Sequence, residues 1–479
     1  MSQPAVILWL RHDLRLTDHV PLDTAAQRGV PVIPVFILDD AAEGDWPGGA
    51  ATKWWLHHSL EKLDQGLKQL GSHLIVLAGR TETVLAQLAS EIGASAVYCH
   101  RRYEPAARKL ELSVATRLGN DGVRFESFPG QLLFEPAGIQ NKQGKPFQVF
   151  TPFWKSCQTR PAPEKPLKSP ARLTPPAHWP ASLQLNDLQL LPAIDWDKGF
   201  YDAWTPGEVG AQQRLKRLRK TISDYKTDRN RPDREGTSRL SPHLHFGEIS
   251  PRQVWHAVHK WINAAQVDAA AATTFLSEIG WREFSHHVLY HFPFTPKTAL
   301  REEFRVFPWK YNAKHLRDWQ RGQTGYPIVD AGLRELWHTG WMHNRVRMIV
   351  GSFLTKDLLV NWVEGAEWFW DTLVDADLAQ NTLNWQWVGG CGADAAPYFR
   401  VFNPILQGKK FDPEGAYVRR WVPELAGCLP EWIHEPWEAP PDVLAEAGIT
   451  IGETYPAPIV NHFAARVAAL EALSAIRKR

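Results

Sequence analysis

Cysteine is scarce in this chain of 479 residues, and its apolar runs are short. The four cysteines, Cys99, Cys157, Cys391 and Cys428, are widely spaced and form no C-x-x-C pair. This argues against a disulfide framework, a zinc knuckle and an iron–sulfur cluster, and it fits a reducing cytosol. The N-terminal apolar run, Ala5–Leu10, is too short for a signal peptide or a membrane span. We therefore expect a buried strand there, in a cytoplasmic protein without a membrane partner.

A strong net charge and the common nucleotide-binding motifs are also missing. The formal net charge is +2, which by itself indicates no nucleic-acid partner. Two local basic runs, Arg214–Lys220 and Arg229–Arg234, are either solvated helix faces or phosphate contacts. The chain has neither a G-x-G-x-x-G pattern nor a P-loop lysine motif, so an ordinary dinucleotide or NTP signature is excluded.

Tryptophan, in contrast, is abundant. The chain has 23, and ten of them lie between Trp281 and Trp387. An indole is a costly core filler because its N–H needs a partner, but it stacks well on planar rings and nucleobases. The cluster indicates flat aromatic ligands, electron movement or both. The alternative is an aromatic-rich helical core.

The hydrophobic pattern predicts an α/β fold. Apolar runs typical of strands alternate with amphipathic stretches such as Lys53–Leu70 and Thr81–Gly93. The expected strands are Ala5–Leu10, Pro31–Leu38, His73–Gly79, Ser95–His100 and Val123–Phe128. We predict an N-terminal doubly wound parallel-sheet domain in residues 1–130. A proline-rich interdomain linker follows in 131–205, and an all-helical domain fills 206–479.

Four stretches of the sequence contain candidate site residues, and the first of them combines hydroxyl groups with one arginine. Within Glu235–Gln253, Thr237, Ser238 and Ser241 offer hydroxyls, and Arg239 offers a forked cation. Such a set can hold phosphates, or it can simply cap a helix.

A carboxyl group beside an indole marks the second stretch, Phe275–Pro293. Glu278 and Arg282 are four residues apart and share one helical face, near Trp281. This arrangement suits a ring with hydrogen-bonding edges; the alternative is a surface ion pair over a core tryptophan. The histidines of this stretch form no H-E-x-x-H motif, so we predict no metal site.

The other two stretches surround Asn344 and Asp375. Asn344 and Arg347 are three residues apart and can reach one ligand, or they belong to an exposed basic face. Asp375 and Asp377 bracket a turn, where they can pair with Arg347, bind ribose hydroxyls or cap a helix.

Taken together, these stretches resemble the DNA photolyases (cyclobutane pyrimidine dimer type, class I-like) of the photolyase/cryptochrome family. The similarity runs from Leu10–His19 (LRHDLRLTDH) to Tyr455–His462 (YPAPIVNH). The specific strings between them are GTSRLSPHLHFGEISPRQ, WREF, TGYPIVDAGLREL, GWMHNRVRM, DADLAQN and AAPYFRVFNP. The resemblance implies a monomer with an FAD-binding helical domain. It also implies DNA containing cyclobutane pyrimidine dimers as the partner and no obligate protein partner.

The matching positions imply the cofactor contacts. Those implied to hold the phosphates and nearby parts of FAD are Tyr225, Thr237, Ser238, Arg239, Leu240 and Ser241. Those implied to line the flavin and its ribose are Phe275, Arg282, Arg347, Asp375 and Asp377. Asn381 matches the residue that faces the redox-active ring nitrogen, and an asparagine there is similar to photolyases.

The implied activity is light-driven repair, in which reduced FAD passes an electron to a dimer flipped out of the duplex. The residues implied to form the dimer pocket are Glu278, Trp281, Asn344, Arg345, Met348 and Trp387. Contacts to the DNA strand, and hence salt-dependent affinity, are implied for Arg229, Arg345 and Gln407. The tryptophan chain that re-reduces FAD from the surface matches Trp385, Trp362 and Trp309.

The identity of the antenna chromophore and the fine geometry of the flavin pocket are left open by individual positions of the sequence. Glu104 matches a folate contact, but the rest of that pocket does not. The antenna chromophore is therefore methenyltetrahydrofolate or 8-hydroxy-deazaflavin, or the site is empty. Phe275 stands where a tryptophan often packs by the flavin, and Asn384 where a glycine is common, which puts the fine geometry of the flavin pocket in doubt.

Two rival functions are weighed against repair of cyclobutane dimers. Relatives that repair (6-4) photoproducts tend to have paired histidines where this chain has His343 and Asn344. A cryptochrome-like photoreceptor without repair is disfavoured by Asn381, Met348 and the intact dimer pocket.

Overall fold

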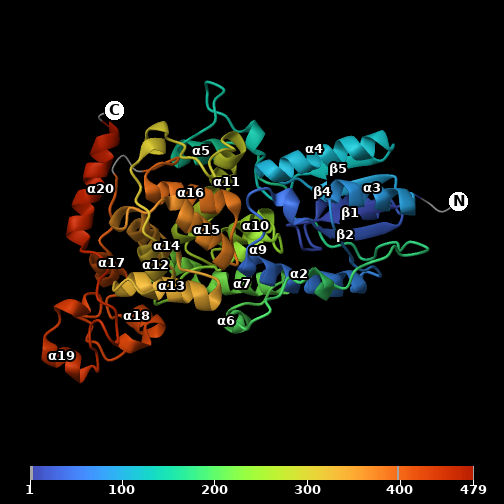
Figure 1. Ribbon diagram of the computed structural model, residues 1–479. Coiled ribbons are helices and arrows are strands. Elements are labelled where there is room, and N and C mark those ends of the chain that lie inside the picture. The colour runs from blue at the N-terminus through green and yellow to red at the C-terminus, as the bar shows by residue number, and fades with distance from the viewer. Residues whose placement is uncertain (1–3, 396–398, 478–479) are drawn as a thin grey trace.

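The N-terminal part of the molecule is a parallel β-sheet, seen in blue and cyan in Figure 1. The computed structural model describes residues 4–395 and 399–477; residues 396–398, inside the AAPYFRVFNP motif, lie outside the described part. The five strands have the order β3-β2-β1-β4-β5. They are β1 (Val6–Leu10), β2 (Val32–Leu38), β3 (Ile75–Ala78), β4 (Ala96–His100) and β5 (Arg124–Phe128). All five predicted strands are thereby confirmed.

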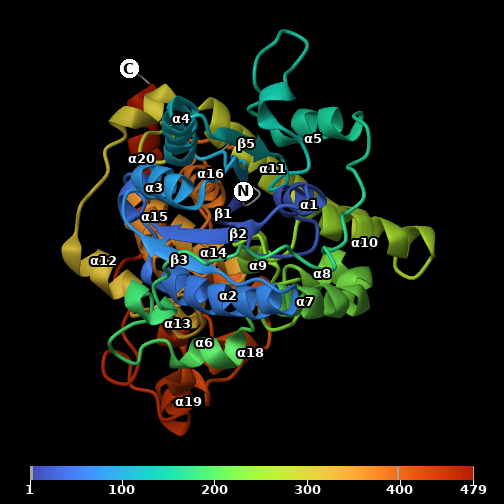
Figure 2. The same cartoon turned by 90° about the vertical axis from the view of Figure 1, so that its right-hand side faces the viewer.

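Helices cover both faces of this sheet, as Figure 2 shows. They are α1 (Val20–Gln27), α2 (Ala50–Gln69), α3 (Thr81–Ile92) and α4 (Pro105–Asn120). Successive side chains of a strand point to opposite faces, so Leu8 packs in the core shared with α1 and α2. Its neighbours Ile7 and Trp9 pack in the core shared with α3 and α4. The strand is apolar throughout because both faces are buried, which confirms the doubly wound class.

The connector after the sheet is mostly irregular. Residues 161–184 form no helix, in agreement with their prolines. Three short helices flank this stretch: α5 (Phe150–Gln158), η3 (Leu185–Leu188) and α6 (Lys198–Ala203). The boundaries at residues 130 and 205 stay predictions.

The rest of the chain is helical, as predicted. Its helices are η4 (Ile222–Asp224), α7 (Glu208–Thr221), α8 (Tyr225–Asp228), α9 (Ser241–His245), α10 (Pro251–Asn263), α11 (Ala269–His291), η5 (Glu302–Val306), α12 (Ala313–Gln320), α13 (Pro327–Thr339), α14 (Asn344–Ser352), η6 (Phe353–Asp357), α15 (Trp362–Thr372), α16 (Leu378–Gly389), α17 (Pro404–Phe411), α18 (Ala416–Trp421), η7 (Pro423–Leu425), η8 (Pro436–Glu438), α19 (Pro441–Glu446) and α20 (His462–Arg477). A remaining 3-10 turn, η1 (Asp40–Glu43), follows β2, and another, η2 (Pro136–Gly138), follows β5. Across the described residues, every helix is too short or too polar to span a bilayer.

Buried hydrogen bonds join the sheet domain to the helical domain. The Arg252 guanidinium donates to the Asp18 carboxylate at 2.7 Å, and Arg15 donates to the carbonyl of Gly247 at 2.8 Å. The indole of Trp55 donates to Glu248 at 3.0 Å. The two domains are therefore held in one arrangement. In Figure 1 the sheet lies at one end of the molecule and α20 at the other.

Candidate active site

A cavity of about 520 Å³ opens in the helical domain. Its walls come from α8, α9, α11, α14 and α16, and from the loop that precedes α9. A cavity of this size suits a large organic ligand. The predicted site residues that line it are Tyr225, Arg229, Thr237, Ser238, Arg239, Leu240, Ser241, Phe275, Glu278, Trp281, Arg282, Asn344, Arg345, Arg347, Met348, Asp375, Asp377, Asn381, Trp385 and Trp387.

An anchored ion pair forms one polar wall of the cavity. Arg347 Nη2 donates to both carboxylate oxygens of Asp375, at 3.0 and 2.9 Å, and Arg347 Nε donates to the Met342 carbonyl at 2.7 Å. The Ser241 hydroxyl donates to the same carboxylate at 2.6 Å. Of the alternatives for Asp375, pairing with Arg347 is the one observed. The side chains are fixed by several bonds each, so this wall has a defined shape.

Arg239 has an unusual backbone conformation beside this wall. Its φ is +50°, in the left-handed region, which costs a residue other than glycine about 1 kcal/mol or more. The guanidinium lies 4.7 Å from the ring centre of Trp341 and 5.9 Å from that of Trp204. Arg239 thus brings a cation to the lining that also carries the hydroxyls of Thr237 and Ser238. Cations and hydroxyls together are suited to phosphate.

Asp377 is a buried carboxylate at the start of α16. Its Oδ1 accepts from the backbone N–H of Gln380 at 3.0 Å, so it is the N-cap of that helix. Its Oδ2 lies 3.5 Å from His286 Nε2 and 3.7 Å from His245 Nδ1. Although burial opposes ionisation, these histidines hold the pKa of Asp377 well below its usual range. The cavity is therefore lined by an ionised carboxylate that also caps a helix.

Glu278 and Trp281 of α11 form the opposite wall. Glu278 pairs with Arg229, which directly follows α8, at 2.5 Å. It does not pair with Arg282, whose guanidinium donates to the Gln131 carbonyl at 2.8 Å. Phe150 of α5 stacks on the Trp281 ring, with centroids 3.9 Å apart and planes 10° apart. One face of this indole is thereby covered, and the ring still lines the cavity.

Three further side chains complete the lining that the sequence singled out. Asn381 donates its Nδ2 to the Ala366 carbonyl at 2.9 Å, which leaves the amide oxygen as its other polar atom. Phe275 packs edge-on against Tyr225 with centroids 5.3 Å apart. Asn384 is exposed and donates to the Gln380 carbonyl, so it occupies the cavity edge without disturbing α16.

The predicted tryptophan chain runs from buried to partly exposed residues. Trp385 and Trp362 are buried, and Trp309 is half-buried. Of the three, Trp385 lines the cavity. Its ring lies edge-on to Phe369 at 4.9 Å and to the buried Trp319 at 6.2 Å. Trp319 has no role predicted from the sequence, because nothing in its local pattern marks it as a neighbour of Trp385.

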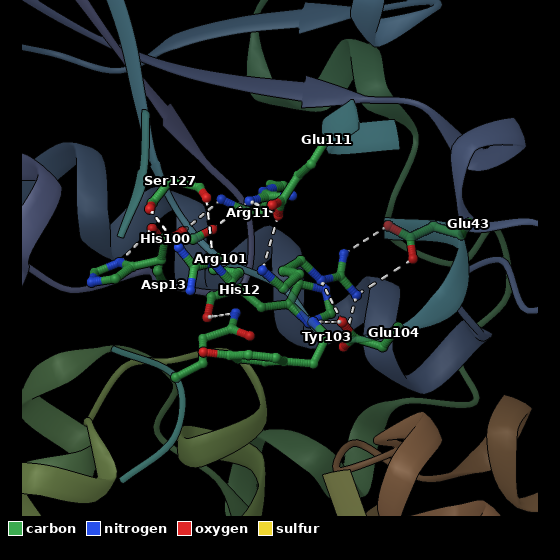
Figure 3. Close-up of polar contacts among 12 residues, drawn as sticks. Arg11, His12, Asp13, Glu43, His100, Arg101, Tyr103, Glu104, Glu111 and Ser127 are labelled. Atoms are coloured by element: carbon green, nitrogen blue, oxygen red, sulfur yellow. Dashed lines mark hydrogen bonds and ion pairs between the residues drawn. The ribbon is translucent and has the colours of Figure 1, made fainter. Parts of the chain in front are cut away.

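A second cavity, of about 110 Å³, lies at the carboxyl ends of β1 and β2. Glu104 lines it and pairs with Arg102 at 3.2 Å, and Arg102 pairs with Glu43 at 2.9 Å. Figure 3 shows Glu43 and Glu104 in this polar network, near His12 and Arg11. Burial opposes ionisation of Glu104, but the charge of Arg102 lowers its pKa to about 2. The Glu104 carboxylate is therefore already held by a protein partner.

The two cavities share part of a wall. His245 and Ala376 line both of them. Deeper in the sheet domain, Asp13 accepts from His100 at 3.0 Å, while His19 Nε2 lies 3.1 Å from the same carboxylate. These three groups are near enough to one another for a metal, within 4.8 Å. We interpret them as a hydrogen-bonded cluster because the ring nitrogens already face the carboxylate.

Comparison with known proteins identifies the family. One family model, described as DNA photolyase, matches residues 6–171, and a second, described as the FAD binding domain of DNA photolyase, matches residues 275–475. A deoxyribodipyrimidine photo-lyase of Agrobacterium fabrum is 48% identical over 475 residues, which cover 99% of this chain and 98% of that protein. The chain belongs to the photolyase/cryptochrome family.

Members of this family with different names are similar to the chain. Cryptochrome-2 of Arabidopsis thaliana is 39% identical, over 98% of this chain and 79% of that protein. The crystal structure of a bacterial class III photolyase from Agrobacterium tumefaciens matches with a TM-score of 0.97 and 47% identity, over 100% of this chain and 99% of that chain. That structural neighbour is a class III photolyase, whereas the sequence motifs of this chain resemble those of class I photolyases.

The family's FAD binding domain contributes most of the 520 Å³ cavity, and the residues present fit FAD. Arg239 and the nearby hydroxyls suit its phosphates, and the aromatic and apolar walls suit its flat rings. Asn381 offers an amide oxygen to a ring edge. The cavity lining thus suits the cofactor in charge and in polarity.

Of the residues with predicted roles toward FAD or DNA, three do not line the 520 Å³ cavity: Gln407, Trp362 and Trp309. Gln407 lies on α17, and its predicted contact with DNA stays a prediction. Sequence reasoning missed Phe150, which supports Trp281, and Asn230, which accepts from Arg345 at 2.6 Å. Phe150 belongs to the connector, where composition gives no sign of a role in a site.

Proposed function

We propose that this protein repairs cyclobutane pyrimidine dimers in DNA under light, by electron transfer from reduced FAD to a dimer flipped out of the duplex. One observation carries the proposal. The predicted dimer contacts Glu278, Trp281 and Met348 line the same cavity as the predicted flavin contacts Asn381 and Asp377. A substrate held there would lie next to the cofactor without an intervening wall.

The residues around the cavity have separable tasks in this proposal. The chemistry that FAD supplies when bound is light-driven transfer of one electron to the dimer and its return after the two bonds between the bases have broken. Trp281, covered on one side by Phe150, offers an apolar plane to one base. Glu278 and Asn344 offer hydrogen bonds to the base edges, and Glu278 stabilises the negative charge that grows on a base carbonyl.

Arg229 and Arg345 are proposed to bind the phosphates of the damaged strand. Both are partly exposed at the cavity lining, as a group that meets DNA must be. DNA containing such dimers is the proposed partner of a cytoplasmic monomer that needs no obligate protein partner.

Repair of an oligonucleotide with one defined cyclobutane thymine dimer tests this function. The FAD-loaded protein is reduced, mixed with the oligonucleotide without oxygen and exposed to blue light. A dark sample and an oligonucleotide with a (6-4) photoproduct serve as controls. We expect light-dependent restoration of the thymines in the cyclobutane substrate alone. Restoration of neither lesion, with FAD bound and photoreducible, would favour the photoreceptor function, and restoration of the (6-4) lesion would favour that repair class.

We also propose that the 110 Å³ cavity receives the ring of an antenna chromophore, with the remainder of the ligand outside it. Its lining includes Trp9, Trp46 and Trp370, and ring stacking suits a folate or deazaflavin head. The cavity is smaller than the roughly 300–1,000 Å³ typical of a whole organic ligand. An absorption spectrum of the purified protein tests this. A near-ultraviolet or blue absorption band in addition to that of FAD, which is lost in Trp46→Ala, supports the proposal. If the protein has been supplied with the folate and with the deazaflavin and still shows the spectrum of FAD alone, the proposal is contradicted.

A further inference from the structure

Two side chains with different predicted tasks are bonded to each other. Arg229 is proposed to bind a DNA phosphate and Glu278 to bind the dimer, yet Arg229 Nη1 donates to Glu278 Oε1 at 2.5 Å. Both side chains are partly exposed, 24% and 27%. While the bond is made, the guanidinium has lost one donor for phosphate, and the carboxylate has lost an acceptor for the base.

The cationic partner of Glu278 belongs to a group of arginines. Arg345 of α14 lies near Arg229 and Arg400, and burial together with their like charge lowers the pKa of Arg345. Arg345 is tied to the same turn as Arg229, because it donates to Asn230 at 2.6 Å. Like charges held together in this way attract a polyanion strongly, and a phosphate can compete with Glu278 for Arg229.

We propose that the Arg229–Glu278 ion pair is a latch that DNA opens: a backbone phosphate takes Arg229, and Glu278 is thereby released to the flipped dimer. This inference rests on the proposed repair function. It assigns to Arg229 a positioning task toward Glu278 in addition to its contact with the strand. The dimer contact then becomes available when the strand is bound and is blocked when it is not.

Release from Arg229 also changes the pKa of Glu278 and therefore its hydrogen bonding. Burial raises the pKa of Glu278, and the charge and hydrogen bond of Arg229 oppose that rise. Tyr225 of α8 is the other titratable group that faces it, and burial raises the pKa of Tyr225 as well. When Arg229 leaves, the opposing effect is lost and the pKa of Glu278 rises further. A carboxyl group with a higher pKa keeps its proton to higher pH, and an uncharged carboxyl donates a hydrogen bond to a base carbonyl.

The sign of the pH effect follows from linkage. If binding raises the pKa of Glu278, the complex holds more protons than the free protein, so DNA affinity rises as the pH falls. The pH range over which the DNA affinity changes lies between the pKa of Glu278 in the free protein and its higher pKa in the complex. Glu278→Gln has no titrating group at this position, and its affinity loses this pH dependence.

Calorimetry of DNA binding in the dark tests the latch. The FAD-loaded protein is titrated with a dimer-containing oligonucleotide in two buffers that differ in ionisation enthalpy, which gives the protons taken up. We expect measurable uptake by the parent and its loss in both Glu278→Gln and Arg229→Gln. Arg345→Gln is the matched control: it also removes one phosphate contact and lowers the salt slope by about 1, but it retains the uptake.

The outcomes separate the latch from the repair function. Tight binding and light-dependent repair without proton uptake would overturn the latch and leave the function standing. Uptake that is the same in parent and Glu278→Gln would overturn it too. If the protein repairs neither lesion, the proposed repair function itself is contradicted.

A second measurement does not depend on protonation. Binding of undamaged duplex should be several-fold tighter for Glu278→Gln than for the parent, because Arg229 no longer has to leave a carboxylate to reach a phosphate. Bound FAD and far-ultraviolet circular dichroism show that each variant is folded. Equal or weaker binding by folded Glu278→Gln would overturn the latch.

Discussion

Two arginine–carboxylate pairs lie in the same cavity and differ in how firmly they are held. The Arg347–Asp375 pair has two contacts between the partners, a third from Arg347 to a carbonyl and a fourth from Ser241, and the Asp375 side chain is 3% exposed. The Arg229–Glu278 pair has a single contact, and its side chains are 24% and 27% exposed.

This difference indicates different tasks for the two pairs. The two arginines are equally exposed, at 24%, so the difference lies in the carboxylates. A multiply bonded pair with a buried carboxylate is costly to open, because opening it leaves an uncompensated charge away from water. A single, partly exposed pair is worth little and exchanges partners easily. We therefore propose that the first pair keeps the cofactor wall in shape and that bound DNA displaces the second pair.

Asp375→Asn should have the largest effect, because it removes the charge that compensates Arg347. Breaking a buried pair costs about 3 kcal/mol or more, so we expect FAD retention to fall roughly a hundredfold or the fold to be lost. The measurements are the FAD content per chain and the melting temperature. Ser241→Ala removes only the hydroxyl donor and should lose far less FAD. Full FAD content in Asp375→Asn would show that the pair does not support the cofactor wall.

The sequence located both walls and offered the Arg347–Asp375 pair among its alternatives, but it did not find the partner of Glu278. Helical spacing put Glu278 with Arg282, whereas the observed partner, Arg229, directly follows another helix, α8, and Arg282 donates to Gln131. Spacing shows which side chains share a face of one helix and contains nothing about the helices that pack against it. The strands were predictable because burial on both faces leaves a continuous apolar run, as in Val6–Leu10.

The stacking of Phe150 on Trp281 was not predictable either, because the two residues lie far apart in the sequence. Trp281→Ala should weaken dark binding of dimer-containing DNA by about 10- to 100-fold, since a stacked base contributes roughly 1–3 kcal/mol. Binding of undamaged DNA should change little. Trp337, which is 53% exposed and lies outside the cavity lining, provides the control variant Trp337→Ala. An equal loss for damaged and undamaged DNA would argue against a stacking role.

Glu278→Ala should slow repair while leaving FAD and the Arg347–Asp375 pair intact, because it removes a hydrogen bond that a glutamine amide would still donate. A hydrogen bond to a group that becomes charged contributes about 1.5 kcal/mol, so we expect roughly a tenfold lower yield of restored thymines per absorbed photon. The measurement uses saturating substrate and saturating light, which removes any effect on DNA affinity. Repair as fast as that of the parent would contradict the proposed role of Glu278.

Trp309→Phe should leave the repair step unchanged and affect only the renewal of reduced FAD. Protein that has been reduced chemically should repair like the parent, while photoreduction of oxidised FAD should fall several-fold, because Trp309 is the partly exposed member of the predicted chain. The indole of Trp319, however, packs edge-on against Trp385, is buried and donates to the Val350 carbonyl. Trp319→Phe is therefore the matched variant. A loss in Trp319→Phe as large as that in Trp309→Phe would show that contact with Trp385 matters more than access to solvent. A normal rate in Trp309→Phe would remove it from the chain.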